Sequence, residues 1–173
     1  MLNWIRIPGP PRAQNDYPGR GLAMDKYDVL KLDNQLCFPL YAASREVIRR
    51  YNPLLSEYGL TYTQYITMMV MWEEKCTTVK DLGSRLFLDS GTLTPVLKEL
   101  EHKGFVTRER SVEDERVLVV KITDPGAALR DKVLGVPGKV ASCVNLEPQE
   151  AAELYRLLNK VIGREPATRT LNS

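Results

Sequence analysis

The chain has 173 residues, which predicts a single domain, and its 43% hydrophobic and 27% charged content suits a soluble protein with a packed core. A net charge of only +2 excludes a strongly basic nucleic-acid binder, and no apolar run approaches the roughly 20 residues that span a bilayer. Three cysteines and one histidine are too few for a disulfide scaffold or a multi-histidine metal site, so we expect a cytoplasmic protein without a metal or cofactor.

Residues 1–23 differ in composition from the rest of the chain. They contain four of the eleven prolines and three of the eleven glycines, show no periodicity, and lack the apolar core of a signal peptide. We interpret them as a disordered upstream extension rather than a DNA-binding arm, and residues 164–173 as a flexible tail. The excess of arginines in the extension accounts for the whole net charge, so residues 24–173 are neutral overall.

Two helices are predicted next. Apolar residues recur at near-helical spacing from Asp33 to Leu55, although Pro39 requires the first turn to be kinked or to start late. The sequence from Thr61 to Gln64 has the spacing of a capping box and opens an apolar helix through Trp72. The methionines of this helix are expected to lie in the core rather than to bind a metal.

A pair of helices separated by a tight link follows. We expect Thr78 to cap the first helix and Gly104 to stop the second, which runs from Ser90 to Lys103. The second helix carries its apolar residues on one face, with small hydroxyl side chains and Lys98 on the other. A helix-turn-helix presents its reading helix to a major groove in this way.

A two-stranded hairpin is predicted from residues 105–110 and 116–123, joined by a loop at 111–115. Asp124, as the cap, and Pro125 are expected to begin a helix that is interrupted near residues 135–138, and a last helix covers about 148–162. Residues 80–121 contain eight basic and eight acidic side chains, so any DNA affinity depends on how these charges are sorted between faces. The pattern alone leaves DNA binding and a purely structural role equally open.

Three stretches of the chain resemble the MarR family of winged-helix regulators, and most closely its organic-hydroperoxide-sensing branch. They are Leu32–Tyr41 (LDNQLCFPLY), Leu86–Lys98 (LFLDSGTLTPVLK) and Arg108–Arg116 (RERSVEDER). The resemblance covers residues 24 to about 163 and implies a mainly α-helical fold with a small β-hairpin wing. It implies a winged-helix DNA-binding lobe at about residues 61–123, and a homodimerisation layer formed by helices at about 26–58 and 124–163.

The resemblance also implies which residues meet a pseudo-palindromic, double-stranded DNA operator. The reading helix would bring to the major groove Ser90, Gly91, Thr92, Thr94, Pro95 and Lys98. The wing would place Arg116 in the minor groove, oriented with the help of Asp114. Arg108 and Arg110 would meet phosphates.

Members of this branch sense hydroperoxides with a cysteine, and Cys37 matches its position. A thiolate there would attack the peroxide oxygen and become a sulfenic acid. The residues that match or adjoin the tyrosines surrounding that sulfur are Tyr41, Tyr51 and Tyr62. Cys143 matches the region of the partner-subunit thiol that captures the sulfenic acid as a disulfide, and an inert core or interface cysteine explains it equally well.

We therefore predict a DNA-binding transcriptional repressor, not an enzyme, that releases its operator when an organic hydroperoxide or related oxidant reacts with Cys37. One alternative is a MarR-type regulator controlled by a small aromatic ligand, without cysteine redox chemistry. A more remote alternative is a thiol peroxidase. Cys76 has no matching role in the branch and is expected to be incidental.

Overall fold

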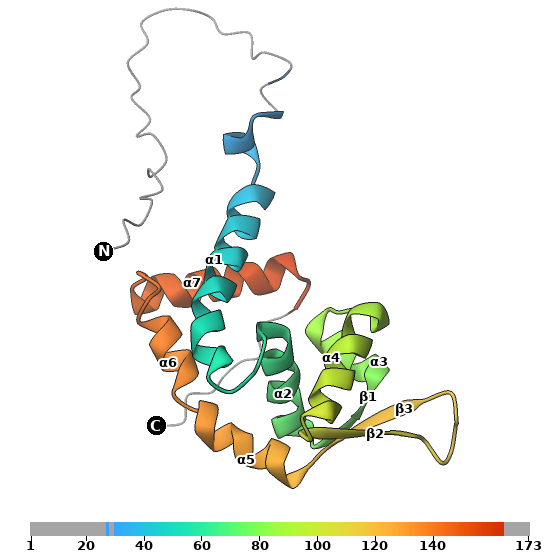
Figure 1. Cartoon of the computed structure of the whole chain (residues 1–173). Helices are drawn as coiled ribbons and strands as arrows, with labels where there is room; N and C mark the ends of the chain where they lie inside the picture. The colour runs from blue at the N-terminus through green and yellow to red at the C-terminus, as the bar shows by residue number, and fades with distance from the viewer. Residues whose placement is uncertain (1–26, 28–29, 165–173) are drawn as a thin grey trace, which may run out of the picture. The chain divides into compact units, whose positions relative to one another are not determined.

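The computed structural model describes residue 27 and residues 30–164 (Figure 1). The predictions for residues 1–23, and for the tail beyond Arg164, lie outside these residues. The chain divides between Ala42 and Ala43 into two compact units. No helix in the described part of the chain is both long and apolar enough to cross a membrane.

The N-terminal unit contains a short 3-10 helix (η2, Leu32–Asn34) and the first residues of α1 (Cys37–Ser56). The expected start of this helix at Asp33 is wrong, because Gln35 is extended, with φ −100° and ψ 112°, and separates the two helical segments. Of the two alternatives that Pro39 left open, a kinked first turn or a late start, the helix shows the late start. Pro39 falls in the first turn of α1, where a backbone N–H has no partner within the helix.

Helix α2 (Tyr62–Glu74) begins with the predicted capping box. The Gln64 N–H donates to Thr61 Oγ1 at 3.3 Å, and the Thr61 N–H donates to Gln64 Oε1 at 3.1 Å. Met68 and Met71 are fully buried, which confirms that they belong to the core, whereas Met69 is 40% exposed and the expectation is wrong for that residue. The helix therefore forms the centre of the second unit.

Helices α3 (Val79–Leu86) and α4 (Ser90–His102) form the predicted helix-turn-helix. Thr78 caps α3 by accepting a hydrogen bond from the Asp81 N–H at 3.1 Å. At Gly83 the two helices approach so closely that an added Cβ would lie 2.7 Å from the Leu88 carbonyl oxygen and 3.3 Å from Leu93 Cδ1. Glycine at this position thus sets how closely α4 packs on α3.

Three antiparallel strands form one sheet in the order β1-β3-β2, from β1 (Cys76–Thr78), β2 (Val106–Arg110) and β3 (Leu118–Ile122). Strands β2 and β3 are the predicted hairpin, with slightly shorter arms. Strand β1 was not predicted, since three residues are too short to show alternation. It pairs with β3 through Thr77 and Val120, so the hairpin is fixed to the segment between α2 and α3.

The last helices are α5 (Asp124–Val133), α6 (Val136–Ala141) and α7 (Pro148–Val161). The prediction that Asp124 caps α5 is wrong, because Thr123 does so by accepting a hydrogen bond from the Gly126 N–H at 3.1 Å. The predicted interruption after α5 contains the short helix α6, with a proline in its first turn. The predicted apolar face of α7 is exposed in the single chain at Leu154, Leu157, Leu158 and Val161.

The hydrophobic core lies within the second unit, among the helix-turn-helix, the sheet and α5. It is continuous from the end of α1 to the start of α6. Its fully buried side chains include Leu55, Leu82, Leu93, Leu97, Leu100, Val106 and Val120. Figure 1 shows the hairpin extending beyond this core beside α3 and α4, so the fold presents α4 and the wing together as expected.

Candidate nucleic-acid interface and cysteine sites

The outer face of α4 carries all six residues expected to enter a major groove, and all six are exposed: Ser90, Gly91, Thr92, Thr94, Pro95 and Lys98. The opposite face is buried through Leu93, Leu97 and Leu100. The helix therefore has one face fixed in the core and one face of small hydroxyl side chains and a lysine. Such groups donate and accept hydrogen bonds at base edges and phosphates.

Asp89 caps the N-terminus of α4. Its carboxylate accepts hydrogen bonds from the Thr92 N–H and the Thr92 hydroxyl, each at 2.9 Å. These bonds lower the pKa of Asp89, so the cap stays ionised. A Cβ at Gly91 would lie 2.9 Å from Asp89 Oδ1, so a larger side chain there would crowd the cap. Asp89 therefore caps α4 from the link between the two helices of the helix-turn-helix.

Lys98 and Arg116 are exposed cations whose side chains form no ion pair with any residue the structure describes. Arg116 follows the wing tip, where its main-chain N–H donates to Asp114 Oδ1 at 2.9 Å. Asp114 thus orders the main chain that carries Arg116. Both cations are available to an external anion, which a phosphate backbone supplies.

Arg108 and Arg110 are held more firmly. Arg108 has a side chain only 19% exposed and forms an ion pair with Glu101 of α4. Its backbone N–H and Nε donate to the two Glu101 carboxylate oxygens at 3.0 and 2.9 Å. Arg110 donates to the Glu115 carbonyl oxygen across the wing at 2.8 Å. Arg108, which was predicted to meet a phosphate, thus has an ion-pair partner within the protein.

Glu101 contacts a predicted site residue, Arg108, but was not itself predicted from the sequence. It lies near the end of α4, and its bonds to Arg108 connect the reading helix directly to the wing. Arg108 lowers the pKa of Glu101, which keeps the carboxylate charged. No sequence signal could have found this pair, because the turn at Gly104 between α4 and β2 brings the two residues together.

The three cysteines are all free and exposed within the described chain. Cys37 is the first residue of α1, and Tyr41 lies one turn further along the same helix. Both belong to the N-terminal unit, whereas Tyr51, Tyr62 and Cys143 belong to the second. Cys76 begins β1, opposite Lys121 of β3.

Two of the predicted tyrosines are brought together in the second unit. The rings of Tyr51 and Tyr62 have centroids 5.0 Å apart, and Tyr65 lies 5.8 Å from Tyr51. Burial raises the pKa of each of these tyrosines. Their hydroxyls therefore remain protonated donors at neutral pH.

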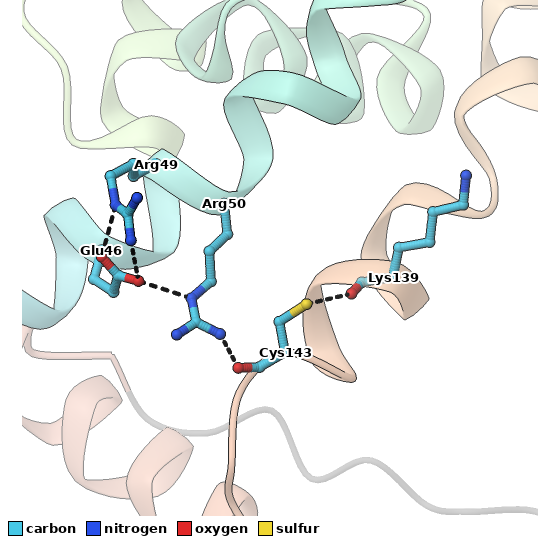
Figure 2. Close-up of polar contacts among 5 residues, drawn as sticks. All are labelled: Glu46, Arg49, Arg50, Lys139 and Cys143. Atoms are coloured by element: carbon cyan, nitrogen blue, oxygen red, sulfur yellow. Dashed lines mark hydrogen bonds and ion pairs between the residues drawn. The ribbon is translucent and has the colours of Figure 1, made fainter. Parts of the chain in front are cut away.

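Cys143 follows the C-terminus of α6, and its thiol donates to the Lys139 carbonyl oxygen at 3.4 Å. Arg50 of α1 donates from Nη1 to the Cys143 carbonyl oxygen (Figure 2). The same arginine pairs with Glu46 at 3.0 Å. Cys143 was predicted from its sequence position, whereas Arg50, which is 93 residues away, was not.

A hollow of about 170 Å³ lies between α2 and the region from α5 to α6. Its lining includes Tyr65, Trp72 and Arg130. This volume is below the roughly 300 Å³ at which drug-sized ligand sites begin. None of the three cysteines lines it.

Known proteins resemble this chain over most of its length. A family model described as "Transcriptional regulator SarA/Rot" matches residues 49–133. The organic hydroperoxide resistance transcriptional regulator of Bacillus subtilis is 46% identical over 133 residues, which span 77% of this chain and 88% of that protein.

Solved structures show the same likeness. Reduced AbfR bound to DNA, a protein of Staphylococcus epidermidis, is 36% identical with a TM-score of 0.69, over 80% of this chain and 95% of that one. Disulfide-formed AbfR is 39% identical with a TM-score of 0.55, over 79% and 96% of the two chains.

Proposed function

This chain belongs to the MarR family of winged-helix transcriptional regulators, and we propose that it is a dimeric repressor whose operator binding is released by oxidation of Cys37. The observation that carries the proposal is the 46% identity to a regulator named for organic hydroperoxide resistance. An exposed cysteine at the first residue of α1 supplies a group that can react with such an oxidant. The role would be performed in the cytoplasm, where the operator lies.

The DNA-binding part of the proposal rests on α4 and the wing. The exposed hydroxyls and Lys98 of α4 would enter the major groove, and Arg116 at the wing would reach the minor groove. Because Glu101 already neutralises Arg108, the wing contributes fewer free cations than its sequence indicates. Affinity would therefore depend on a few well-placed groups rather than on bulk charge.

Homodimerisation would use the apolar face of α7. Leu154, Leu157, Leu158 and Val161 are 37–64% exposed in the single chain, and their spacing places them on one side of the helix. A contiguous apolar face of this kind is covered in a stable protein by a partner surface. A two-fold dimer would place two α4 helices for the two halves of a pseudo-palindromic operator.

The redox step would begin at Cys37 and consume one hydroperoxide. The thiolate attacks the terminal peroxide oxygen, the O–O bond breaks, and an alcohol leaves after taking up a proton. Cys37 is then a sulfenic acid, oxidised by two electrons. The thiolate of Cys143 from the partner would attack this sulfur, forming a disulfide and releasing hydroxide, which a proton converts to water.

The sensing reaction is stoichiometric, which distinguishes it from a peroxidase. A peroxidase would regenerate its thiol with a reductant and consume many equivalents of hydroperoxide. We expect one equivalent per reacting Cys37 to be consumed and no sustained turnover in the presence of a thiol reductant. Sustained turnover would favour the enzymatic alternative.

The test is a fluorescence anisotropy titration against the protein's own upstream DNA. Reduced wild type and Cys37→Ser should bind alike, and cumene hydroperoxide should weaken only the wild type. Binding by the wild type that is insensitive to oxidant would overturn the sensing role and leave the DNA-binding role intact. Absence of binding to any upstream fragment by the reduced protein would overturn the DNA-binding role.

A further inference from the structure

Among the hydrogen bonds that the described residues form, one side chain from another helix reaches the segment that follows α6. The Cys143 N–H donates to the Val140 carbonyl at 2.9 Å, and its thiol donates to the Lys139 carbonyl at 3.4 Å. Both of these bonds remain within the last turn of α6. The bond from Arg50 to the Cys143 carbonyl comes from α1 (Figure 2).

Arg50 is itself fixed by Glu46. Nε of Arg50 donates to Glu46 Oε1 at 3.0 Å, and Arg49 donates to both carboxylate oxygens at 2.9 Å. The two guanidinium groups lower the pKa of Glu46 to about 2, so the carboxylate is charged at neutral pH. The guanidinium group of Arg50 therefore bridges Glu46 on α1 and the main chain of Cys143.

Position matters for Cys143 because its proposed reaction is between two sulfurs on different subunits. A disulfide forms only where the two Cα atoms approach to about 4.4–6.8 Å, and errors of about 1 Å in placing reacting groups can cost on the order of a hundredfold in rate. A cysteine at the end of a six-residue helix, followed by the link to α7, needs an external contact to hold one position.

We propose that Arg50 is a positioning residue for Cys143, holding its thiol where it captures the sulfenic acid of Cys37 from the partner. The inference rests on the proposed function, and specifically on the resolving role of Cys143. Arg50 takes no part in the bond changes. It acts by fixing the main chain of Cys143, so its removal affects the second redox step and not the first.

The two steps are measured separately on the full-length dimer after addition of cumene hydroperoxide. Sulfenic acid formation at Cys37 is followed by dimedone trapping and mass spectrometry in a Cys143→Ser background. Disulfide formation is followed on non-reducing gels with Cys143 present. For Arg50→Ala we expect an unchanged first step and a second step slower by roughly ten- to a hundredfold.

Arg50→Lys should recover part of the lost rate, because an ammonium group can still donate to the Cys143 carbonyl. Arg49→Ala is the matched control. It removes the same charge and another partner of Glu46, and Figure 2 shows no bond between Arg49 and Cys143. We expect it to leave both steps unchanged. If Arg50→Ala does not fold, Arg50→Lys and Glu46→Gln carry the test, each with a slowed second step.

The outcomes separate this inference from the proposed function. If the wild type forms sulfenic acid but no Cys37–Cys143 disulfide, the resolving role fails and the inference fails with it. If the wild type forms the disulfide and Arg50→Ala forms it equally fast, the inference alone is wrong. The inference is also wrong if Arg49→Ala slows disulfide formation as much as Arg50→Ala does. It is wrong as well if Arg50→Ala slows both sulfenic acid formation and disulfide formation.

Discussion

Glu101 of α4 holds Arg108 of β2 by hydrogen bonds to the main chain and to the guanidinium group at once. The backbone N–H of Arg108 donates at 3.0 Å, Nε at 2.9 Å and Nη2 at 2.5 Å. One carboxylate thus fixes both the start of the wing and the direction of its arginine. The pair therefore links the reading helix directly to the first strand of the wing.

Glu101→Gln should destabilise the protein by no more than about 1 kcal/mol at neutral pH, because the pair is partly exposed. Since Arg108 lowers the pKa of Glu101, the stabilisation is fully present above the unfolded-state pKa of about 4.3. It is lost as the pH falls through the lower folded-state pKa. Urea unfolding should therefore show the difference between wild type and Glu101→Gln closing as the pH is lowered, and a constant difference would contradict the assignment.

Lys98→Ala and Arg116→Ala should each weaken operator binding without affecting stability, since neither side chain has an ion-pair partner in the part of the chain described. Each should reduce the slope of log affinity against log salt by about one, measured by anisotropy between about 50 and 200 mM salt. Lys139→Ala, an exposed lysine on α6, is the control and should leave the slope unchanged. If Lys98→Ala and Arg116→Ala show the same salt slope as Lys139→Ala, then α4 and the wing do not contact the DNA phosphates.

Gly83→Ala should destabilise the fold by about 1–3 kcal/mol. The new Cβ would meet the Leu88 carbonyl oxygen at 2.7 Å, and a backbone atom in a helix-turn-helix cannot move without displacing α4. Gly135→Ala is the control, because a Cβ there meets nothing within 4 Å. Urea unfolding of both variants checks the expectation, and similar stabilities would show that α3 and α4 can separate at no cost.

Much of the fold could be predicted from local sequence signals. The elements that were missed or wrongly bounded depend on contacts between residues far apart in the fold. The capping box at Thr61 and the cap at Thr78 were predictable because each involves residues three apart. Strand β1 was missed because only its pairing with β3 makes it a strand. At α5, Thr123 and Asp124 are adjacent potential caps, and the choice between them depends on the approach of the chain to Gly126.

The candidate site likewise has a part that could be predicted from the sequence and a part that could not. The exposed face of α4 could be predicted from helical periodicity, because the spacing of the residues places the hydroxyl side chains and the leucines on opposite faces of the helix. The partners of the site residues did not follow from it. Glu101 meets Arg108 through a turn, and Arg50 meets Cys143 across 93 positions, so no spacing rule connects either pair. Residue types were readable from the sequence, whereas their contacts required the structure.

Leu157→Asp should weaken the homodimer strongly, because it places a charge in the centre of the apolar face of α7, where Leu157 is 44% exposed in the single chain. We expect the dissociation constant to rise at least about a hundredfold, with operator affinity falling in parallel. Sedimentation velocity over a range of concentrations measures the change. Gln149→Asp, which adds the same charge to the other side of α7, should remain dimeric, and loss of the dimer in both variants would point to a general effect on the helix.

The resemblance to hydroperoxide-sensing regulators implies that Tyr62 acts on the sensing sulfur, so we predict that Tyr62→Phe slows the oxidation of Cys37 by roughly ten- to a hundredfold, the cost of losing a hydrogen bond to a charged group. Burial and the neighbouring Tyr51 raise the pKa of Tyr62, so its hydroxyl remains a donor well above neutral pH. The slowing should therefore be the same from about pH 6 to about pH 9. Dimedone trapping in a Cys143→Ser background measures the rate.

Tyr58→Phe serves as the control for Tyr62→Phe, since Tyr58 also packs against the core and follows α1. It should leave the rate of Cys37 oxidation unchanged. Both variants should bind the operator as tightly as the wild type when reduced, because neither tyrosine lies on α4 or the wing. An unchanged oxidation rate in Tyr62→Phe, or equal slowing in Tyr58→Phe, would show that the hydroxyl of Tyr62 does not act on the sulfur.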